Sequence, residues 1–228
     1  MSEPSPEAMD RVARAALDEV KRGMRLGLGT GRAAEAFIRR LGERVRDGLD
    51  VTCVVTSIRS EKLARELGIP VVTLDELFEL DIAFDGADEV APNLDLTKGL
   101  GGALLRERVV AHAAARFVVL VTPEKRVAKL GTRAPIPIEV VPFAKTPVHH
   151  ALTHLGGRPT LRQKDQTVAL TDNGNVLLDT HFDPIDDPRT LDGKIRAIPG
   201  VVDTGIFLSM ADCVLIGAED DVERLVRA

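Results

Sequence analysis

A repeated order of short apolar segments and amphipathic helices constrains the fold of the first 121 residues more than any other feature of the sequence. Apolar residues at helical spacing predict helices, and β-branched apolar runs predict strands. In chain order the predicted elements are a helix at 6–21, a strand at 24–28, a helix at 33–45, a strand at 51–55, a helix at 60–67, strands at 71–73 and 81–84, a helix at 103–114 and a strand at 116–121. This order predicts a parallel sheet with helices on both faces. In such sheets ligands bind at the carboxyl ends of the strands.

The pattern changes after residue 130. The segment 134–142 is extended and punctuated by prolines, which predicts an edge strand or a crossing between domains. Asn173-Gly174 lies between two alternating apolar runs and predicts a hairpin, because both residues tolerate positive φ. The other predicted elements here are helices at 147–155 and 189–198 and strands at 160–163, 167–171, 175–180 and 201–207. Together they form an α+β unit of ferredoxin-like order.

The end of the chain returns to the first pattern. Residues 213–217 are predicted as a further core strand, and residues 222–226 as a last helix. We therefore predict a Rossmann-like α/β catalytic domain from residues 1–130 and 208–228, with a smaller α+β domain inserted at residues 131–207.

Composition and charge argue against several classes of function. The formal net charge is −5, aromatic residues make up only 3%, and Trp and Tyr are absent, which disfavours nucleic-acid binding. No run of about 18 apolar residues is present for a membrane span, and the N-terminal residues lack the pattern of a secretory signal. Cys53 and Cys213 lie in β-branched apolar segments, so we expect buried thiols in a reducing cytoplasm.

Two clusters in the middle of the chain carry residues suited to chemistry. Asp85, Asp88 and Glu89 follow an apolar strand, and Lys98 leads through a glycine-rich turn into the helix of Glu107. Carboxylates near a lysine suit proton transfer, and a glycine turn before a helix suits anion binding. The acidic turn also fits a divalent-metal site or a solvated surface, and by spacing alone Glu107 is more typical of a surface glutamate. No histidine accompanies the carboxylates, which disfavours a transition metal.

A glycine turn at residues 27–32 joins the first strand to a helix, but it lacks the dinucleotide-binding pattern. The third glycine of G-x-G-x-x-G would fall at Arg32, and the second strand ends in Thr56-Ser57 without an acidic residue. Phosphate binding by backbone N–H groups at the helix start and a plain tight turn are both open interpretations. His150 and His154 are one helical turn apart, and without a third ligand we interpret them as solvated.

At these residues the sequence resembles the ribose-5-phosphate isomerase A family, from the N-terminal helix to the last strand. The segments that carry the resemblance are residues 27–31, 85–89, 98–107, 137–142, 155–159, 171–175 and 198–202. Matches in this order along the whole chain are highly specific.

The resemblance implies an enzyme of the pentose phosphate pathway that interconverts D-ribose 5-phosphate and D-ribulose 5-phosphate without a cofactor or a metal. It implies that Glu107 is the general base and moves a proton between C1 and C2 through a cis-enediolate. Asp85, Asp88 and Lys98 would assist ring opening and balance charge. The substrate-binding residues implied by position are Thr30, Gly31, Arg32, Ala33, Asp85, Gly86, Ala87, Asp88, Lys98, Gly99, Leu100, Gly101 and Lys125. The only other expected partner is the chain itself, as a homodimer or homotetramer. The resemblance implies that the inserted domain, which is poor in chemically active residues, is the contact surface.

The sequence departs from the pattern of the family in three places. The family usually continues the first glycine turn with Ser-Thr, where this chain has Arg32-Ala33, and we predict that Arg32 takes over part of the phosphate binding. Leu100 and Gly102 stand where the family commonly has glycine and alanine. Met9-Asp10 occupies the region of the first helix where the family often has a lysine.

Two other classes of function remain open. A sugar-phosphate-binding regulatory domain without catalysis would share the fold of the first domain, since fold does not fix function. The joint presence of Glu107, Asp85, Asp88 and Lys98 favours the enzyme. A nucleotide-dependent oxidoreductase is disfavoured by the failed dinucleotide pattern.

Overall fold

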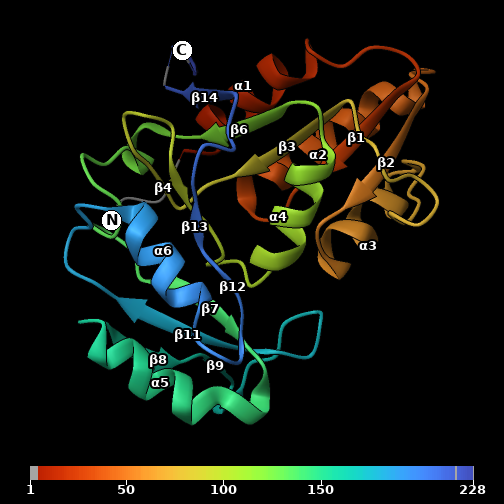
Figure 1. The fold of residues 1–228 in the computed structure, drawn as a ribbon. Coiled ribbons are helices and arrows are strands. Elements are labelled where there is room, and N and C mark those ends of the chain that lie inside the picture. Colours follow the sequence, from red (N-terminus) through yellow and green to blue (C-terminus); the bar gives the residue numbers. More distant parts are fainter. Residues whose placement is uncertain (1–4, 219, 228) are drawn as a thin grey trace. The chain divides into compact units, whose positions relative to one another are not determined.

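The computed structural model describes residues 5–218 and 220–227, and the chain divides into two units (Figure 1). The first unit contains the chain up to Ala87, the segment Arg106–Lys125 and the chain from Ser209 onward; the second contains Asp88–Leu105 and Arg126–Leu208. Residues 88–105 had been predicted to belong to the first domain. They group with the second unit because their two short strands pair with each other and with residues 206–207.

The first unit is built on a six-stranded sheet that is parallel except at one edge. Across the sheet its strands are β15 (Val222–Val226), β14 (Cys213–Gly217), β6 (Phe117–Val121), β3 (Ile82–Gly86), β1 (Met24–Leu28) and β2 (Val51–Val55). The helices of this part of the chain are α1 (Pro6–Leu17), α2 (Arg32–Arg46), α3 (Ile58–Glu66) and α4 (Leu104–Ala113), with the short 3₁₀ helix η1 (Pro123–Lys125). The predicted Rossmann-like α/β architecture is confirmed.

Two predicted elements of this unit are wrong. Residues 222–226 form strand β15, not a helix, because they pair antiparallel with β14 along their full length and cover the edge of the sheet. Five residues are too few for their apolar pattern to distinguish the two structures. The predicted strand at 71–73 is reduced to a single parallel bridge between Val71 and Cys53.

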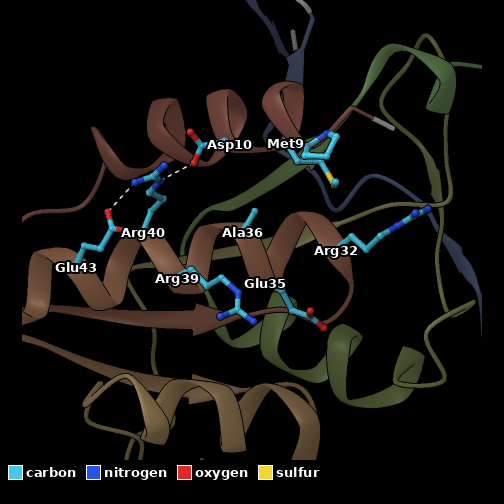
Figure 2. A pocket seen from close by; sticks show the side chains of 9 residues that line it. Met9, Asp10, Arg32, Glu35, Ala36, Arg39, Arg40 and Glu43 are labelled. Atoms are coloured by element: carbon cyan, nitrogen blue, oxygen red, sulfur yellow. Dashed lines mark hydrogen bonds and ion pairs between the residues drawn. The ribbon is translucent and has the colours of Figure 1, made fainter. Parts of the chain in front are cut away.

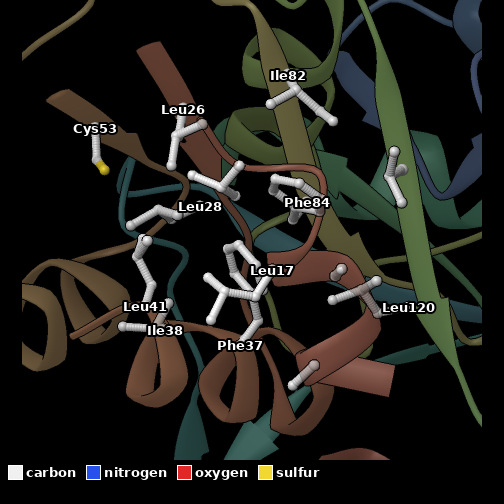
Figure 3. Packing of buried hydrophobic residues seen from close by; sticks show 14 of the residues in the cluster. Leu17, Leu26, Leu28, Phe37, Ile38, Leu41, Cys53, Ile82, Phe84 and Leu120 are labelled. Atoms are coloured by element: carbon white, nitrogen blue, oxygen red, sulfur yellow. The ribbon is translucent and has the colours of Figure 1, made fainter. Parts of the chain in front are cut away.

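Alternation along the strands gives the two faces of this sheet different environments. Leu28 of β1 and Phe84 of β3 point into the main core with Phe37 of α2, and the two phenylalanine rings lie 4.3 Å apart (Figure 3). Gly27 and Ala83 therefore point to the opposite face, which α4 covers (Figure 1). By the same alternation Asp85 of β3 lies on the α4 face.

The two cysteines are buried in this unit, as predicted. Burial raises the pKa of the Cys53 thiol to about 12 and also raises the pKa of Cys213. Both thiols are therefore protonated and poorly reactive near neutral pH. In residues 5–218 and 220–227 no helix is both long and apolar enough to cross a membrane.

The second unit contains a four-stranded antiparallel sheet with two helices. Across the sheet its strands are β12 (Val201–Thr204), β7 (Ile136–Val140), β11 (Val176–His181) and β8 (Arg158–Leu161). The helices are α5 (Lys145–His154) after β7, with η2 (Pro142–Ala144) before it, and α6 (Pro188–Arg196) before β12. Two smaller sheets are formed by β4 (Glu89–Val90), β5 (Leu96–Thr97) and β13 (Ile206–Phe207), and by β9 (Gln163–Lys164) and β10 (Thr167–Val168). The main chain order, strand, helix, two strands, helix and strand, confirms the ferredoxin-like prediction.

The proline-containing segment 134–142 is not an edge strand, because β7 lies between β12 and β11. Pro137 is tolerated there because the ladder to β12 begins only at Ile138. The carbonyl of Pro137 accepts a hydrogen bond from Gly205 N at 2.7 Å, and in an antiparallel strand N and C=O of one residue point to the same side. The nitrogen of Pro137, which carries no proton, therefore faces the side of β12, where the pairing of the two strands begins only at Ile138.

Two further predictions in this unit hold only in part. The predicted strand at 201–207 divides at Gly205 into β12 and β13, which belong to different sheets. The predicted Asn173-Gly174 turn is present, with Thr171 N donating to Asn175 O at 2.8 Å. Its first arm does not form a full hairpin with β11, because Thr167–Val168 pairs with β9 instead and Leu170 alone bridges to Val176.

Candidate active site

In the first unit the candidate site residues lie where β1, β3 and β6 end. These strands are neighbours in the sheet, so the turn after β1, the end of β3 and the segment after β6 share one edge. Asp85 is only 2% exposed. One of its carboxylate oxygens, Oδ1, accepts the N–H of Thr30 at 3.0 Å and that of Gly86 at 2.7 Å. The carboxylate is therefore held in one orientation by the backbone.

Glu107 lies in the first turn of α4 and is only 3% exposed. The interpretation as a surface glutamate is wrong. Glu107 and Asp85 line the same narrow space, which is too small to hold a water molecule and is otherwise bounded mostly by apolar side chains. The start of a helix carries a partial positive charge that stabilises a carboxylate. Two carboxyl groups at one enclosed space are an arrangement suited to proton transfer.

Four hydroxyl groups lie beside this space, and only one of them was among the residues predicted for the site. Thr30 is within hydrogen-bond distance of Thr56, Ser57 and Ser60, and all four residues are buried. Thr56 also lines the space shared by Asp85 and Glu107. The sequence signal is the pair Thr56-Ser57 at the end of the second strand, where a dinucleotide-binding fold would carry an acidic residue.

The turn after β1 leads into α2 with Gly31 at the N-cap position, at φ 102°. Gly31 provides no side-chain cap for the first N–H groups of the helix, and such groups can bind an anion. Arg32, the first residue of α2, is exposed, and Ala33 lies close to Gly86. Ala87 is half-buried directly after Gly86, and Lys125 is half-buried at the end of η1, where its N–H donates to Thr122 O at 3.0 Å.

A surface hollow of about 360 Å³ between α1 and α2 is lined by charged side chains, Arg32 among them (Figure 2). Arg40 bonds to both Asp10 and Glu43, the second at 2.8 Å. The hydrogen bond from Arg40 holds the pKa of Asp10 below its ordinary value. Figure 2 shows the Arg32 side chain pointing away from this ion-pair group. The Asp10 carboxylate is thus paired with arginine side chains.

In the second unit, Asp88 and the segment after β5 are held together. Asp88 N donates to Thr97 O at 2.7 Å, and Asp88 Oδ2 accepts from Leu100 N at 3.0 Å. Lys98, between these two contacts, is 2% exposed, and its Nζ lies 5.7 Å from the centre of the Phe207 ring. Gly99 has φ 101° and begins the turn, while Leu100 and Gly101 are exposed.

Arg162 is a further residue of this part that sequence reasoning missed. Its guanidinium donates to the carbonyls of Gly99 at 3.2 Å and Leu100 at 3.1 Å. It also pairs with Asp179 at 2.8 Å. Arg162, the residue directly after β8, therefore fixes the glycine turn. The two segments are about 60 residues apart in the chain (|i−j| 63 and 62), so no local sequence signal relates them.

Glu89 serves the structure of the second unit. Its two oxygens accept the N–H groups of Gly131 at 2.6 Å, Arg133 at 2.5 Å and Ala134 at 3.2 Å, and the residue is fully buried. Among the residues that the structure describes, no group of three or more His, Cys, Asp or Glu side chains is arranged to hold a metal ion. His150 and His154 are exposed, in agreement with their interpretation as solvated residues.

Comparisons with known proteins agree with the resemblance seen in the sequence. The family model of ribose 5-phosphate isomerase A (phosphoriboisomerase A) matches residues 52–221. The ribose-5-phosphate isomerase A of Roseiflexus castenholzii is 50% identical over 94% of this chain and 93% of its own length. That of Thermosynechococcus vestitus is 47% identical over 100% of this chain and 98% of its own.

Solved structures give the same result. Ribose 5-phosphate isomerase A from Methanocaldococcus jannaschii has a TM-score of 0.92 and 45% identity, covering 96% of this chain and 98% of its own. A D-ribose-5-phosphate isomerase in complex with phospho-erythronic acid has a TM-score of 0.95 and 38% identity, covering 98% of this chain and 100% of its own. On the family model, the identities and the shared fold, this chain belongs to the ribose 5-phosphate isomerase A family.

Proposed function

We propose that this chain interconverts D-ribose 5-phosphate and D-ribulose 5-phosphate, as a step of the pentose phosphate pathway. The observation that carries the proposal is the enclosed position of Glu107 and Asp85 around one narrow space. Membership of the family supports the substrate, since the relatives are named for it. A related structure in complex with phospho-erythronic acid supports the binding of a small phosphorylated sugar derivative.

Glu107 is the proposed general base. In the open form of the aldose, the proton on C2 is acidic because it lies next to the C1 carbonyl. Glu107 takes this proton, which leaves a cis-enediolate, and returns it to C1, while the hydroxyl proton moves from O2 to O1 to give the ketose. A carboxylate from which water is excluded is a stronger base towards such a proton than one in solution.

Asp85, Asp88 and Lys98 are the proposed partners of this transfer. Asp85, held by two backbone N–H groups, is oriented for exchange of hydroxyl protons during ring opening. Lys98 supplies a cationic donor for the developing oxyanion. Asp88 orients the turn that follows Lys98, because it accepts the N–H of Leu100.

Activity of the unmodified protein tests this proposal directly. In an assay that couples D-ribulose 5-phosphate formation to a second enzyme, we expect turnover of D-ribose 5-phosphate, and we expect that addition of a metal chelator leaves the rate unchanged. Binding of the sugar phosphate without turnover would favour the regulatory-domain alternative. A rate that falls with the chelator and recovers with added metal would contradict the metal-free mechanism.

Arg32 is proposed to bind the phosphate together with the backbone N–H groups at the start of α2. Arg32→Ala is expected to raise the KM for ribose 5-phosphate roughly fivefold with little change in kcat, since an exposed ion pair contributes about 1 kcal/mol. The matched control is Arg39→Ala, an exposed arginine two turns further along the same helix. Steady-state kinetics of both variants make the comparison. An unchanged KM in Arg32→Ala removes this role.

Assembly and location follow from the resemblance and stay predictions. We propose a homodimer or homotetramer whose contacts use the second unit, in the cytoplasm. Phe143 in η2 is 96% exposed, and Val141 beside it is 42% exposed, and such side chains are commonly covered in an interface. Light scattering coupled to size-exclusion chromatography measures the mass of the assembly.

A further inference from the structure

The four buried hydroxyl groups beside the candidate site form one connected hydrogen-bond network. Thr56 and Thr30 are joined at 2.7 Å, Thr30 and Ser57 at 2.8 Å, and Ser57 and Ser60 at 3.0 Å. Ser60 Oγ then donates to the carbonyl oxygen of Gly29 at 2.7 Å. Ser57 is also the N-cap of α3, accepting Ser60 N at 3.1 Å. This hydrogen-bond network thus joins the ends of β1 and β2 to the start of α3.

The direction of every hydrogen bond in this network follows from the bond between Ser60 and the carbonyl oxygen of Gly29. A carbonyl oxygen only accepts, so the single hydroxyl proton of Ser60 points to Gly29. Ser57 must then donate to Ser60, since Ser60 has no second proton. By the same reasoning Thr30 donates to Ser57, and Thr56 donates to Thr30. Each of the four protons is then donated within the group, and the longer contact of 3.2 Å between Thr30 Oγ1 and Ser60 Oγ offers the Thr30 proton a second acceptor there.

Thr30 has consequently no proton left for a ligand. Its hydroxyl proton is directed to Ser57, and its backbone N–H is directed to Asp85 Oδ1 at 3.0 Å. The resemblance implies that Thr30 contacts the substrate. Within the protein, the bonds of its hydroxyl and its backbone N–H fix the turn and, through it, the carboxylate of Asp85.

We propose that Thr56, Ser57 and Ser60 are positioning residues, whose hydroxyls hold Thr30 so that its N–H keeps Asp85 in its working orientation. This inference rests on the proposed isomerase function. The first member, Thr56, lines the space shared by Asp85 and Glu107. Removal of its hydroxyl leaves the shape of that space almost unchanged but takes away the proton that Thr56 donates to the oxygen of Thr30.

The test is Thr56→Val, which replaces the hydroxyl by a methyl group of the same size. We expect kcat for ribose 5-phosphate to fall about tenfold with the KM within about twofold, because small displacements of a reacting group lower the rate without weakening binding. Thr56→Ser, which restores the hydroxyl, is expected to recover most of the rate. The matched control is Thr52→Val in strand β2, which ends at Val55, directly before Thr56.

A second measurement does not depend on activity. Thr56→Val is expected to speed hydrogen exchange of the Thr30 amide at least threefold relative to wild type, while Thr52→Val is not. The proposal is overturned if Thr56→Val unfolds at lower urea concentration but keeps both the wild-type kcat and the wild-type exchange rate. It is also overturned if Thr52→Val lowers kcat as much as Thr56→Val does. If the wild-type protein shows no isomerase activity, the proposed function fails, and the amide exchange still decides whether the hydroxyls hold Thr30.

Discussion

Replacement of Glu107 by Gln is expected to lower kcat at least a hundredfold, the largest effect of any substitution considered. A general base contributes about 10²–10⁴-fold to the rate, and the amide of Gln is too weak a base to accept the proton from C2. The change keeps the size of the side chain, so the narrow space shared with Asp85 is retained and the KM is expected to change little. Steady-state kinetics with ribose 5-phosphate measure both constants.

The chain offers a closely matched control for this experiment. Glu61 occupies the fourth position of α3, as Glu107 does in α4, but it is partly exposed and pairs with Arg65 at 2.9 Å. Glu61→Gln loses only a surface pair of about 0.2–0.5 kcal/mol and is expected to leave kcat unchanged. Similar rates for Glu107→Gln and wild type would remove Glu107 from the role of base, whatever the activity of the protein.

The sequence predicted the parallel sheet well because its strands are short, rich in apolar residues and mostly separated by helices. The boundaries of β1 and β2 were predicted to the residue, and the crossover order then fixed which strand ends share an edge. The candidate residues Thr30 and Asp85 could therefore be placed at that edge from the sequence alone. Local pattern and general topology rules were sufficient for this part of the site.

The burial of Glu107 could not be predicted in the same way. Apolar residues occur around α4 without a clear stripe, and of the neighbours Val109 and Val110 the first is exposed while the second is buried. Periodicity therefore gave no buried face for this helix. Only the packing of α4 on the face of the sheet that carries Gly27 and Ala83 decides which side is enclosed.

Other features that the sequence did not predict have a related cause, since each depends on residues that are distant in sequence. Pro137 suggested an edge strand, but the end of the β12 ladder makes an interior position tolerable. Thr56, Ser57 and Ser60 acquire their role only because β1 and β2 are neighbours, which brings them to Thr30. Arg162 reaches the glycine turn at Gly99 across the fold of the second unit. Contacts of this kind are set by tertiary structure and leave no spacing signal.

Gly29→Ala is expected to lower kcat/KM about a hundredfold, the second large effect, although no catalytic group is altered. A Cβ at this position would lie 2.1 Å from both Cγ and Oδ1 of Asp85. The turn cannot easily move away, because Gly29 N donates to Phe84 O at 2.9 Å and Gly29 O accepts from Ser60 at 2.7 Å. The carboxylate of Asp85 must therefore be displaced, and a misplacement of about 1 Å can cost roughly 10²-fold in rate.

The effect of this substitution is steric and has a clear control. Gly29 is not among the glycines with positive φ, so alanine is compatible with its backbone conformation. Gly193→Ala adds the same methyl group within helix α6, where nothing lies within 4 Å, and is expected to leave kcat/KM unchanged and to stabilise the fold by up to about 1 kcal/mol. Overpacking at Gly29 is expected to cost about 1–3 kcal/mol of unfolding free energy, so urea unfolding of both variants is measured together with the kinetics.

A double-mutant cycle separates displacement of Asp85 from a general loss of packing. In the Asp85→Gly background the atoms that would clash with the new methyl group are absent, so adding Gly29→Ala is expected to cost little further activity. Strong non-additivity of this kind is the mark of two residues in direct contact. If the two substitutions instead multiply their losses, the turn at Gly29 acts on the rate by a route other than Asp85. The assignment of Asp85 as the group that this turn holds in place would then be wrong.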